Sequence, residues 1–90
     1  MTATDPIPRF RAGVKFRLDA VRGAWVLLAP EKLFLPDETA VEILKLVDGE
    51  RSVAVIVDTL SVAFAAPRDV IARDVLATLT DLAAKGAVRL

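Results

Sequence analysis

The chain has 90 residues, and its 12 basic and 12 acidic side chains give a formal net charge of zero. This balance provides no long-range field to gather nucleic acid or anionic lipid, so we expect neither a nucleic-acid partner nor a membrane. The sequence contains no cysteine and no histidine. This excludes thiolate-based zinc and iron–sulfur sites, thiolate nucleophiles and histidine-based catalytic triads. We therefore expect no metal site, no cofactor, no catalytic residue and no enzymatic activity.

A chain of this size forms one domain. Its hydrophobic fraction of 54% and charged fraction of 27% are typical of a globular protein. The absence of cysteine, of a signal peptide and of an apolar run of about 18 residues favours a cytoplasmic location. Residues 1–8 contain two prolines and no apolar alternation, so we expect a flexible N-terminal arm followed by one folded domain over residues 9–90.

Three strands are predicted in the first part of the chain. Residues 9–19 alternate between apolar and polar side chains, which is typical of a strand with one face in water. Residues 24–29 are almost continuously apolar, as expected for a central strand. The turn at Pro30-Glu31 returns residues 32–35 as a third strand. Two short connections give an antiparallel meander, in which the third strand is a weakly protected edge. The side chains expected to face inward from the first strand are Phe10, Val14, Phe16 and Leu18.

The first helix is predicted to begin at Pro36-Asp37-Glu38 and to stop at Asp48-Gly49. Proline near the first helical position and acidic residues in the first turn are both helix-start signals. Its apolar side chains recur at i, i+3, i+4 and i+7, at Ala40, Ile43, Leu44 and Val47.

A second helix is predicted after Ser52, which can cap it. Five β-branched residues between Val53 and Thr59 favour extended structure, whereas the apolar spacing favours a helix. The expected inner positions are Val53, Ile56, Val57, Leu60 and Phe64.

The third helix is predicted from Pro67 to about Lys85, with Gly86 ending it. Its expected inner face is Ile71, Val75, Thr78, Leu79 and Leu82. A second stripe of mostly small side chains, Ala72, Leu76 and Ala83, is either covered by the sheet or the arm, or open as a binding groove. After it, Val88 and Leu90 either form a short final strand or pack down. The expected fold is α+β and winged-helix-like, a three-stranded antiparallel sheet followed by a three-helix bundle.

The charged residues argue against two functional classes, DNA binding and catalysis by paired carboxylates. The third helix offers as many carboxylates as cations, which does not suit DNA-groove recognition. The cations are Arg68, Arg73 and Lys85, and the carboxylates are Asp69, Asp74 and Asp81. The carboxylate pair Asp37 and Glu38 is explained by a helix start, and the pair Asp48 and Glu50 by a glycine turn.

The stretch GAWVLLAPEKLFLPDETAVEILKLVDGERSVAVIVDTL, followed by APRDVIARDVLATLTDLAAKG, resembles the PqqD family of pyrroloquinoline quinone (PQQ) biosynthesis and, through it, leader-peptide recognition elements. The most specific pieces are Trp25 with Leu27-Leu28, Pro30-Glu31, Ile43-Leu44 with Asp48-Gly49, Asp74-Val75 with Leu79, Leu82 and Gly86. Pro36 departs from relatives that have a polar cap there.

The resemblance implies a non-catalytic peptide chaperone. In such proteins the precursor peptide PqqA adds as a strand to the third strand, lies against the last helix and is presented to the radical-SAM enzyme PqqE. The corresponding positions here are Lys32, Leu33, Phe34, Leu35, Ala72, Arg73, Leu76 and Thr80. Strand addition provides affinity through backbone hydrogen bonds.

Two alternatives stay open on the residues alone: a winged-helix DNA-binding protein, and a structural adaptor that docks proteins by helix faces. A further hypothesis is that the chain forms a homodimer through edge pairing or swapping. A proline at Phe34 should abolish peptide capture but spare a helix-face adaptor.

Overall fold

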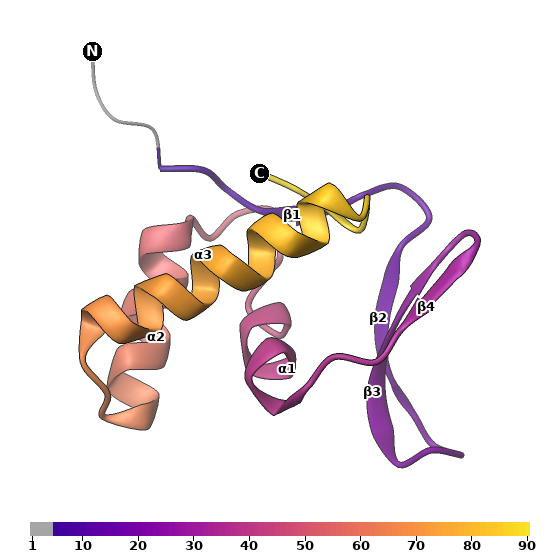
Figure 1. Cartoon of the computed structure of the whole chain (residues 1–90), viewed down its shortest axis with the longest axis horizontal. Helices are drawn as coiled ribbons and strands as arrows, with labels where there is room; N and C mark the ends of the chain where they lie inside the picture. Colours follow the sequence, from indigo (N-terminus) through magenta and orange to yellow (C-terminus); the bar gives the residue numbers. More distant parts are fainter. Residues whose placement is uncertain (1–4) are drawn as a thin grey trace.

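The computed structural model describes residues 5–90 and shows a sheet beside a group of three helices (Figure 1). The predicted α+β class, with a three-stranded antiparallel sheet followed by three helices, is confirmed. Two very short strands, at the beginning and end of the described chain, form a further small sheet. The elements in chain order are β1 Arg9–Phe10, β2 Lys15–Asp19, β3 Ala24–Ala29, β4 Lys32–Phe34, α1 Glu38–Leu44, α2 Val53–Phe64, α3 Arg68–Ala84 and β5 Val88–Arg89.

The three-stranded sheet has the order β2-β3-β4, so the nearly continuous apolar strand is central, as predicted. Leu27 of β3 lies opposite Phe16 on one side and Phe34 on the other. Leu27 is fully buried in the main core, so this face of the sheet is the one turned toward the helices. Leu18 shares that face but is 55% exposed, because it lies close to the exposed β2–β3 turn. The inward position predicted for Leu18 is therefore wrong.

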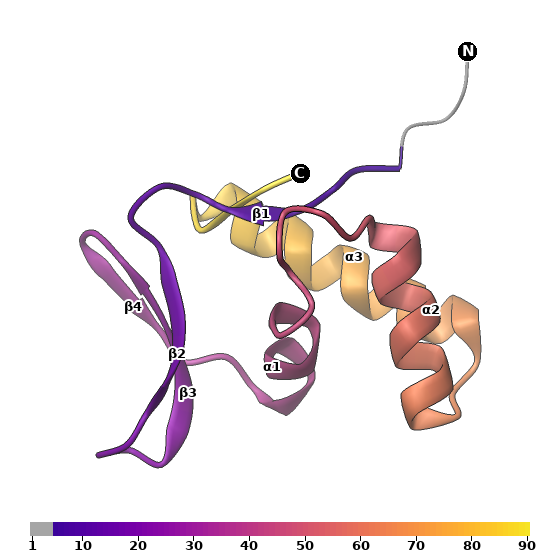
Figure 2. The same ribbon diagram turned by 180° about the vertical axis from the view of Figure 1, so that it is seen from behind.

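The predicted single strand over residues 9–19 is wrong, because a turn interrupts it. Gly13 has φ of 82°, a conformation that favours glycine, and the N–H of Val14 donates to the carbonyl of Arg11 at 3.0 Å. This turn separates β1 from β2 and lets β1 pair antiparallel with β5. Seen from behind, β1 passes near the C-terminal half of α3 (Figure 2). The end of the chain thus forms a short strand, one of the two predicted alternatives.

The N-terminal segment is bound to the domain where the structure describes it. The carboxylate of Asp5 and the carbonyl of Pro6 accept hydrogen bonds from backbone N–H groups at the start of α2, at 3.1 and 2.9 Å. These N–H groups have no partner within the helix, so outside acceptors stabilise its first turn. Pro8 is buried. The expectation of a free arm is therefore wrong from Asp5 onward, and residues 1–4 lie outside the described part.

The helix starts follow the predicted capping chemistry. The carboxylate of Asp37 accepts the N–H of Ala40 at 2.8 Å, and the hydroxyl of Ser52 accepts the N–H of Val55 at 3.2 Å. Each side chain satisfies an N–H group that the helix itself cannot pair. Asp37 is thus the N-cap and α1 begins at Glu38, so Pro36 lies before the helix and not at its first position.

The first helix ends earlier than predicted. After Leu44 the chain tightens, so that the N–H of Leu46 donates to the carbonyl of Ile43 and the N–H of Val47 donates to Leu44. This spacing of three residues is that of a tight 3₁₀-type turn. Val47 nevertheless stays 94% buried, with an exposed fraction of 6%, so its predicted core position is confirmed.

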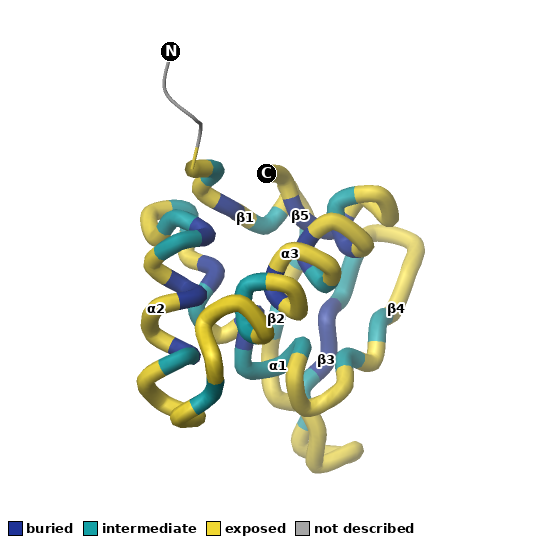
Figure 3. Tube along the Cα trace, turned by 60° about the vertical axis from the view of Figure 1, so that its left-hand side comes forward, coloured by how far each residue is buried: buried dark blue, intermediate teal, exposed yellow. Residues whose placement is uncertain are grey.

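The main core lies where α3 crosses α1 and α2, and buried segments of β3 and β5 complete it (Figure 3). The predicted core position of Phe64 is wrong, because this last residue of α2 is 54% exposed. The buried side chains of the core are Leu27, Ile43, Leu44, Val47, Val53, Ile56, Val57, Leu60, Val75, Leu79, Leu82, Ala87 and Val88.

Candidate functional site

The outer edge of β4 is not paired within residues 5–90. β4 follows β3 through the two-residue turn predicted at Pro30-Glu31, and Ala29 lies opposite Lys32 across that turn. The residues that flank such a turn form a hydrogen-bonded pair. Since bonded and non-bonded pairs alternate along an antiparallel ladder, Leu33 is the next residue and belongs to a non-bonded pair.

The backbone of Leu33 therefore points away from the sheet. Its partner Leu28 is opposite it but does not exchange N–H···O bonds with it. Phe34, one residue further, is in the bonded register with Leu27. Leu33 is thus the residue of β4 whose N–H and C=O are both free to bind another strand.

A groove of about 530 Å³ lies between this edge and α3. Its floor contains the buried side chains of Leu27 and Leu82, and its α3 wall includes Thr78, Asp81 and Lys85. An apolar floor beside a free backbone edge can accept alternate side chains of an added strand. We call this site the β4–α3 groove.

The charges on the α3 wall form a local pair. The ammonium of Lys85 lies 2.9 Å from the carboxylate of Asp81, and both side chains are at least half exposed. A surface pair of this kind adds little to stability and can exchange partners. It therefore gives the groove one cation and one anion that are available to a ligand.

Three of the four predicted strand residues line the β4–α3 groove. Leu33 and Leu35 are 45% and 62% exposed, and Phe34 packs partly against the core. Lys32 shares the face of Phe34, because side chains alternate along a strand. Leu33, Phe34 and Leu35 therefore form one wall of the β4–α3 groove, whereas Lys32 does not line it.

The predicted helix residues do not line the β4–α3 groove. A helix turns about 100° per residue, so Leu76 and Thr78 lie about 160° apart around the axis of α3. The groove is lined by the flank that carries Thr78, and the opposite flank carries the residues that had been expected there, Ala72, Arg73, Leu76 and Thr80. Ala72 packs partly against the core, whereas the other three are exposed.

The helix residues that do line the groove are Ala77, Thr78, Asp81, Leu82 and Lys85. Thr78, Asp81 and Lys85 recur at i, i+3 and i+7, which is the spacing of one helix flank. This spacing was visible in the sequence. The side of α3 that faces β4 was not, and only that orientation distinguishes the two flanks.

The carboxylate of Asp48 has a structural role in the turn between α1 and α2. Asp48 accepts the N–H groups of Glu50 and Arg51 at 2.9 and 2.8 Å, and its second oxygen binds the Arg51 guanidinium at 2.9 Å. The backbone hydrogen bond from Arg51 is the largest cause that lowers the pKa of Asp48 below its usual 3.8. Within residues 5–90 no cluster of three or more metal-ligating side chains occurs.

None of the helices described is long and apolar enough to cross a membrane.

Comparison with known proteins identifies the family of this chain. The family model for coenzyme PQQ synthesis protein D (PqqD) matches residues 24–88. A PqqA binding protein from Rhodopseudomonas palustris (strain TIE-1) is 53% identical over 85 residues, which are 94% of this chain and 80% of that protein.

Two solved structures share the fold. One is the solution structure of the PqqD truncation of Methylobacterium extorquens PqqCD, a functional and stand-alone recognition element for ribosomally synthesized and post-translationally modified peptides. It has a TM-score of 0.78 and 42% identity, and the match covers 92% of this chain and 88% of that one. The other, lasso peptide synthetase B1 complexed with its leader peptide, has a TM-score of 0.79 at 22% identity, covering 94% and 100%. The chain belongs to the PqqD family.

Proposed function

We propose that the chain is a non-catalytic, cytoplasmic peptide chaperone of PQQ biosynthesis that binds the precursor peptide PqqA by strand addition and presents it to the radical-SAM enzyme PqqE. The observation that carries this proposal is the unpaired backbone of Leu33 beside the β4–α3 groove. The relatives named PqqA binding protein support PqqA as the peptide.

Strand addition to β4 would use the backbone of Leu33 as its anchor. A peptide residue placed opposite Leu33 in antiparallel orientation would exchange two N–H···O bonds with it. The edge ends shortly after, because Pro36 has no N–H to donate. The recognised segment is therefore short, and affinity must also come from side chains that enter the groove.

Alternate peptide side chains would point into the β4–α3 groove. The buried floor at Leu27 and Leu82 suits an apolar side chain. On the α3 wall we propose Thr78, Asp81 and Lys85 as peptide-contacting residues, in place of the positions expected on the opposite flank.

The test is a proline at Leu33, with a matched alanine. Leu33→Pro removes only an N–H that faces the free edge, and proline is tolerated in edge strands at such positions. Leu33→Ala keeps the N–H and removes the side chain. We expect labelled PqqA to lose at least about tenfold in affinity for the proline variant, and much less for the alanine variant.

One result of this experiment is decisive. Unchanged PqqA affinity in a folded Leu33→Pro variant would contradict strand addition to β4. The proline at Phe34 suggested by the sequence is not a clean test, because the Phe34 N–H lies in the bonded register with β3 and its loss would damage the sheet. An amide spectrum of each variant checks that the fold is preserved.

The same edge supports a homodimer as a competing state. Two copies could pair their β4 strands through Leu33, because an unprotected edge is a template for another chain. PqqA should then convert dimers to peptide-bound monomers. Sedimentation at increasing protein concentration, with and without PqqA, measures this, and a chain that stays monomeric at high concentration would remove the dimer from the proposal.

A further inference from the structure

A second surface depression lies on the other side of α1 from the β4–α3 groove. It has a volume of about 770 Å³ and is bounded by the β2–β3 hairpin end, α1, the end of α2 and the first half of α3. The two depressions share only Pro36 among their lining residues. We call the second one the α1 hollow, and its lining includes Trp25, Glu38, Glu42, Phe64, Ile71 and Asp74.

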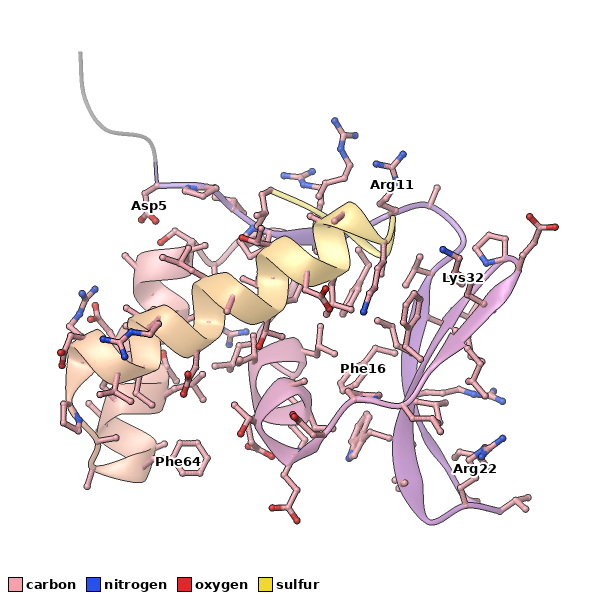
Figure 4. All side chains as sticks on the ribbon, viewed as in Figure 1. Asp5, Arg11, Phe16, Arg22, Lys32 and Phe64 are labelled. Atoms are coloured by element: carbon pink, nitrogen blue, oxygen red, sulfur yellow. The ribbon has the colours of Figure 1, made fainter. Side chains whose placement is uncertain are left out.

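The α1 hollow has an apolar interior. Ile43, Leu60 and Val75 line it and are buried in the core beneath. Phe64 is 54% exposed at the end of α2, and its ring projects toward α1 (Figure 4). A large aromatic side chain left at the margin of an apolar depression is typical of a contact that a partner buries.

The opposite wall of the hollow is held in place by aromatic packing. The Trp25 ring stacks on Phe16 at a centroid distance of 4.7 Å, and Phe16 lies between the sheet and α1 (Figure 4). The ammonium of Lys45 lies 5.4 Å from the Trp25 ring centre. The hollow is therefore a preformed shape and does not depend on ordering a loop.

The charge of the hollow is negative. Among the described residues that line it, Lys45 is the one cation, and Lys45 is already bound to Glu42 at 3.1 Å. Glu38 and Asp74 form no ion pair with any side chain of residues 5–90. The complementary occupant thus carries lysine or arginine side chains beside apolar ones.

The occupant is not an added strand. β3, which contributes Trp25, is the central strand and is paired on both sides, so no free backbone edge lines the hollow. Recognition here must come from side chains, as when an amphipathic helix lies in an apolar groove.

We propose that the α1 hollow binds a basic amphipathic segment of the enzyme that receives the peptide. This inference rests on the proposed function, because a chaperone that presents a peptide must hold the peptide and the enzyme at the same time. The position of α1 between the two depressions allows both to be occupied at once. Neither ligand would need to displace the other.

Charge reversal tests the proposal. The variant Glu38→Lys with Asp74→Lys changes two unpaired carboxylates of the hollow. The matched control, Glu50→Lys with Asp69→Lys, makes the same change in net charge outside the hollow, and like Glu38, Asp69 lies in the first turn of a helix. We expect the hollow variant to lose at least about tenfold in affinity for PqqE and the control to lose much less.

Phe64→Ala provides a second variant that keeps the charge. Because Phe64 is exposed, the fold should be little affected, and PqqE affinity should fall by about tenfold or more. Trp25 is the only tryptophan, so replacing it by 5-fluorotryptophan gives a single fluorine signal inside the hollow. That signal should move when unlabelled PqqE is added and much less when PqqA is added.

The outcomes separate this inference from the proposed function. PqqA affinity is measured on every variant. If the unaltered chain does not bind PqqA, peptide capture is contradicted. If PqqA binds but the unaltered chain does not bind PqqE, or if the hollow variants bind PqqE as tightly as the control, the inference about the α1 hollow is overturned. Loss of PqqE binding in both hollow variants with PqqA binding retained supports it.

Discussion

The two depressions beside α1 differ in the kind of atom that they offer to a partner. The β4–α3 groove has a backbone edge at Leu33 and an apolar floor, whereas the α1 hollow has side chains alone. Backbone hydrogen bonds are the same for nearly every residue, so the groove can hold a strand and leave selection to a few pockets. The hollow must select by shape and charge. This difference is why we propose an extended peptide for the first site and a folded partner for the second.

The largest effect is expected for a substitution in the main core, whose buried residues lie beneath both depressions. Leu27 is fully buried, forms part of the groove floor and belongs to the main core. Leu27→Ala should lower the free energy of unfolding by about 3 kcal/mol, because the cavity is not refilled. Urea unfolding measures this. The control Leu76→Ala, at a side chain that is 46% exposed, should cost far less. Equal losses for the two variants would contradict the assigned core.

A bulky side chain on α3 separates the groove from the opposite flank. Thr78→Trp should fill the β4–α3 groove and reduce PqqA affinity by about tenfold, or about 1.4 kcal/mol. Leu76→Trp places the same bulk on the flank that the sequence had indicated, and should leave PqqA affinity unchanged. Titration of labelled PqqA into both variants measures the difference. A loss confined to Leu76→Trp would restore the original assignment of the helix flank. In the absence of PqqA, neither Thr78→Trp nor Leu76→Trp should change the affinity for PqqE, because both residues lie outside the α1 hollow.

The smallest effect is expected at the turn between α1 and α2, outside both depressions. The folded pKa of Asp48 lies below its usual value, so its contribution to stability is full above about pH 4 and is lost as the pH falls through the folded pKa. Asp48→Asn should slightly lower the melting temperature at neutral pH and should reduce the loss of stability on acidification. Melting curves between acidic and neutral pH measure this. Identical acid dependence in the two proteins would show that the Asp48 turn contributes nothing.

Much of the fold followed from local signals in the sequence. The apolar run of β3, the Pro30-Glu31 turn and the caps at Asp37 and Ser52 each act within a few residues, so pattern and propensity were enough to place them. The α+β class followed from their order.

The features that the sequence did not reveal depend on distant parts of the chain. Asp5 binds the N–H of Ala54 across 49 positions, and the pairing of β1 with β5 joins the two ends of the described chain. The turn at Gly13 has no proline or asparagine to mark it, and the alternation continues across it.

The site was only half predictable for the same reason. A strand edge is a local feature, so the sequence could place Leu33, Phe34 and Leu35 beside the groove, although Lys32 does not line it. A helix has two flanks beside its buried stripe, and the apolar residues Ala72 and Leu76 indicated the flank that does not line the β4–α3 groove. The flank with Thr78 is more polar, and only the folded structure shows that this flank lines the β4–α3 groove.

The central claim is that the Leu33 backbone accepts an added strand, and hydrogen exchange at its amide tests this most directly. In the free chain the Leu33 N–H faces outward from the last strand of the sheet, so it should exchange rapidly with solvent. Saturating PqqA should slow this exchange strongly, while the Leu76 amide, inside α3, should keep its rate. A Leu33 amide that is already protected in the free monomer, or that stays unprotected in the PqqA complex, would contradict the account.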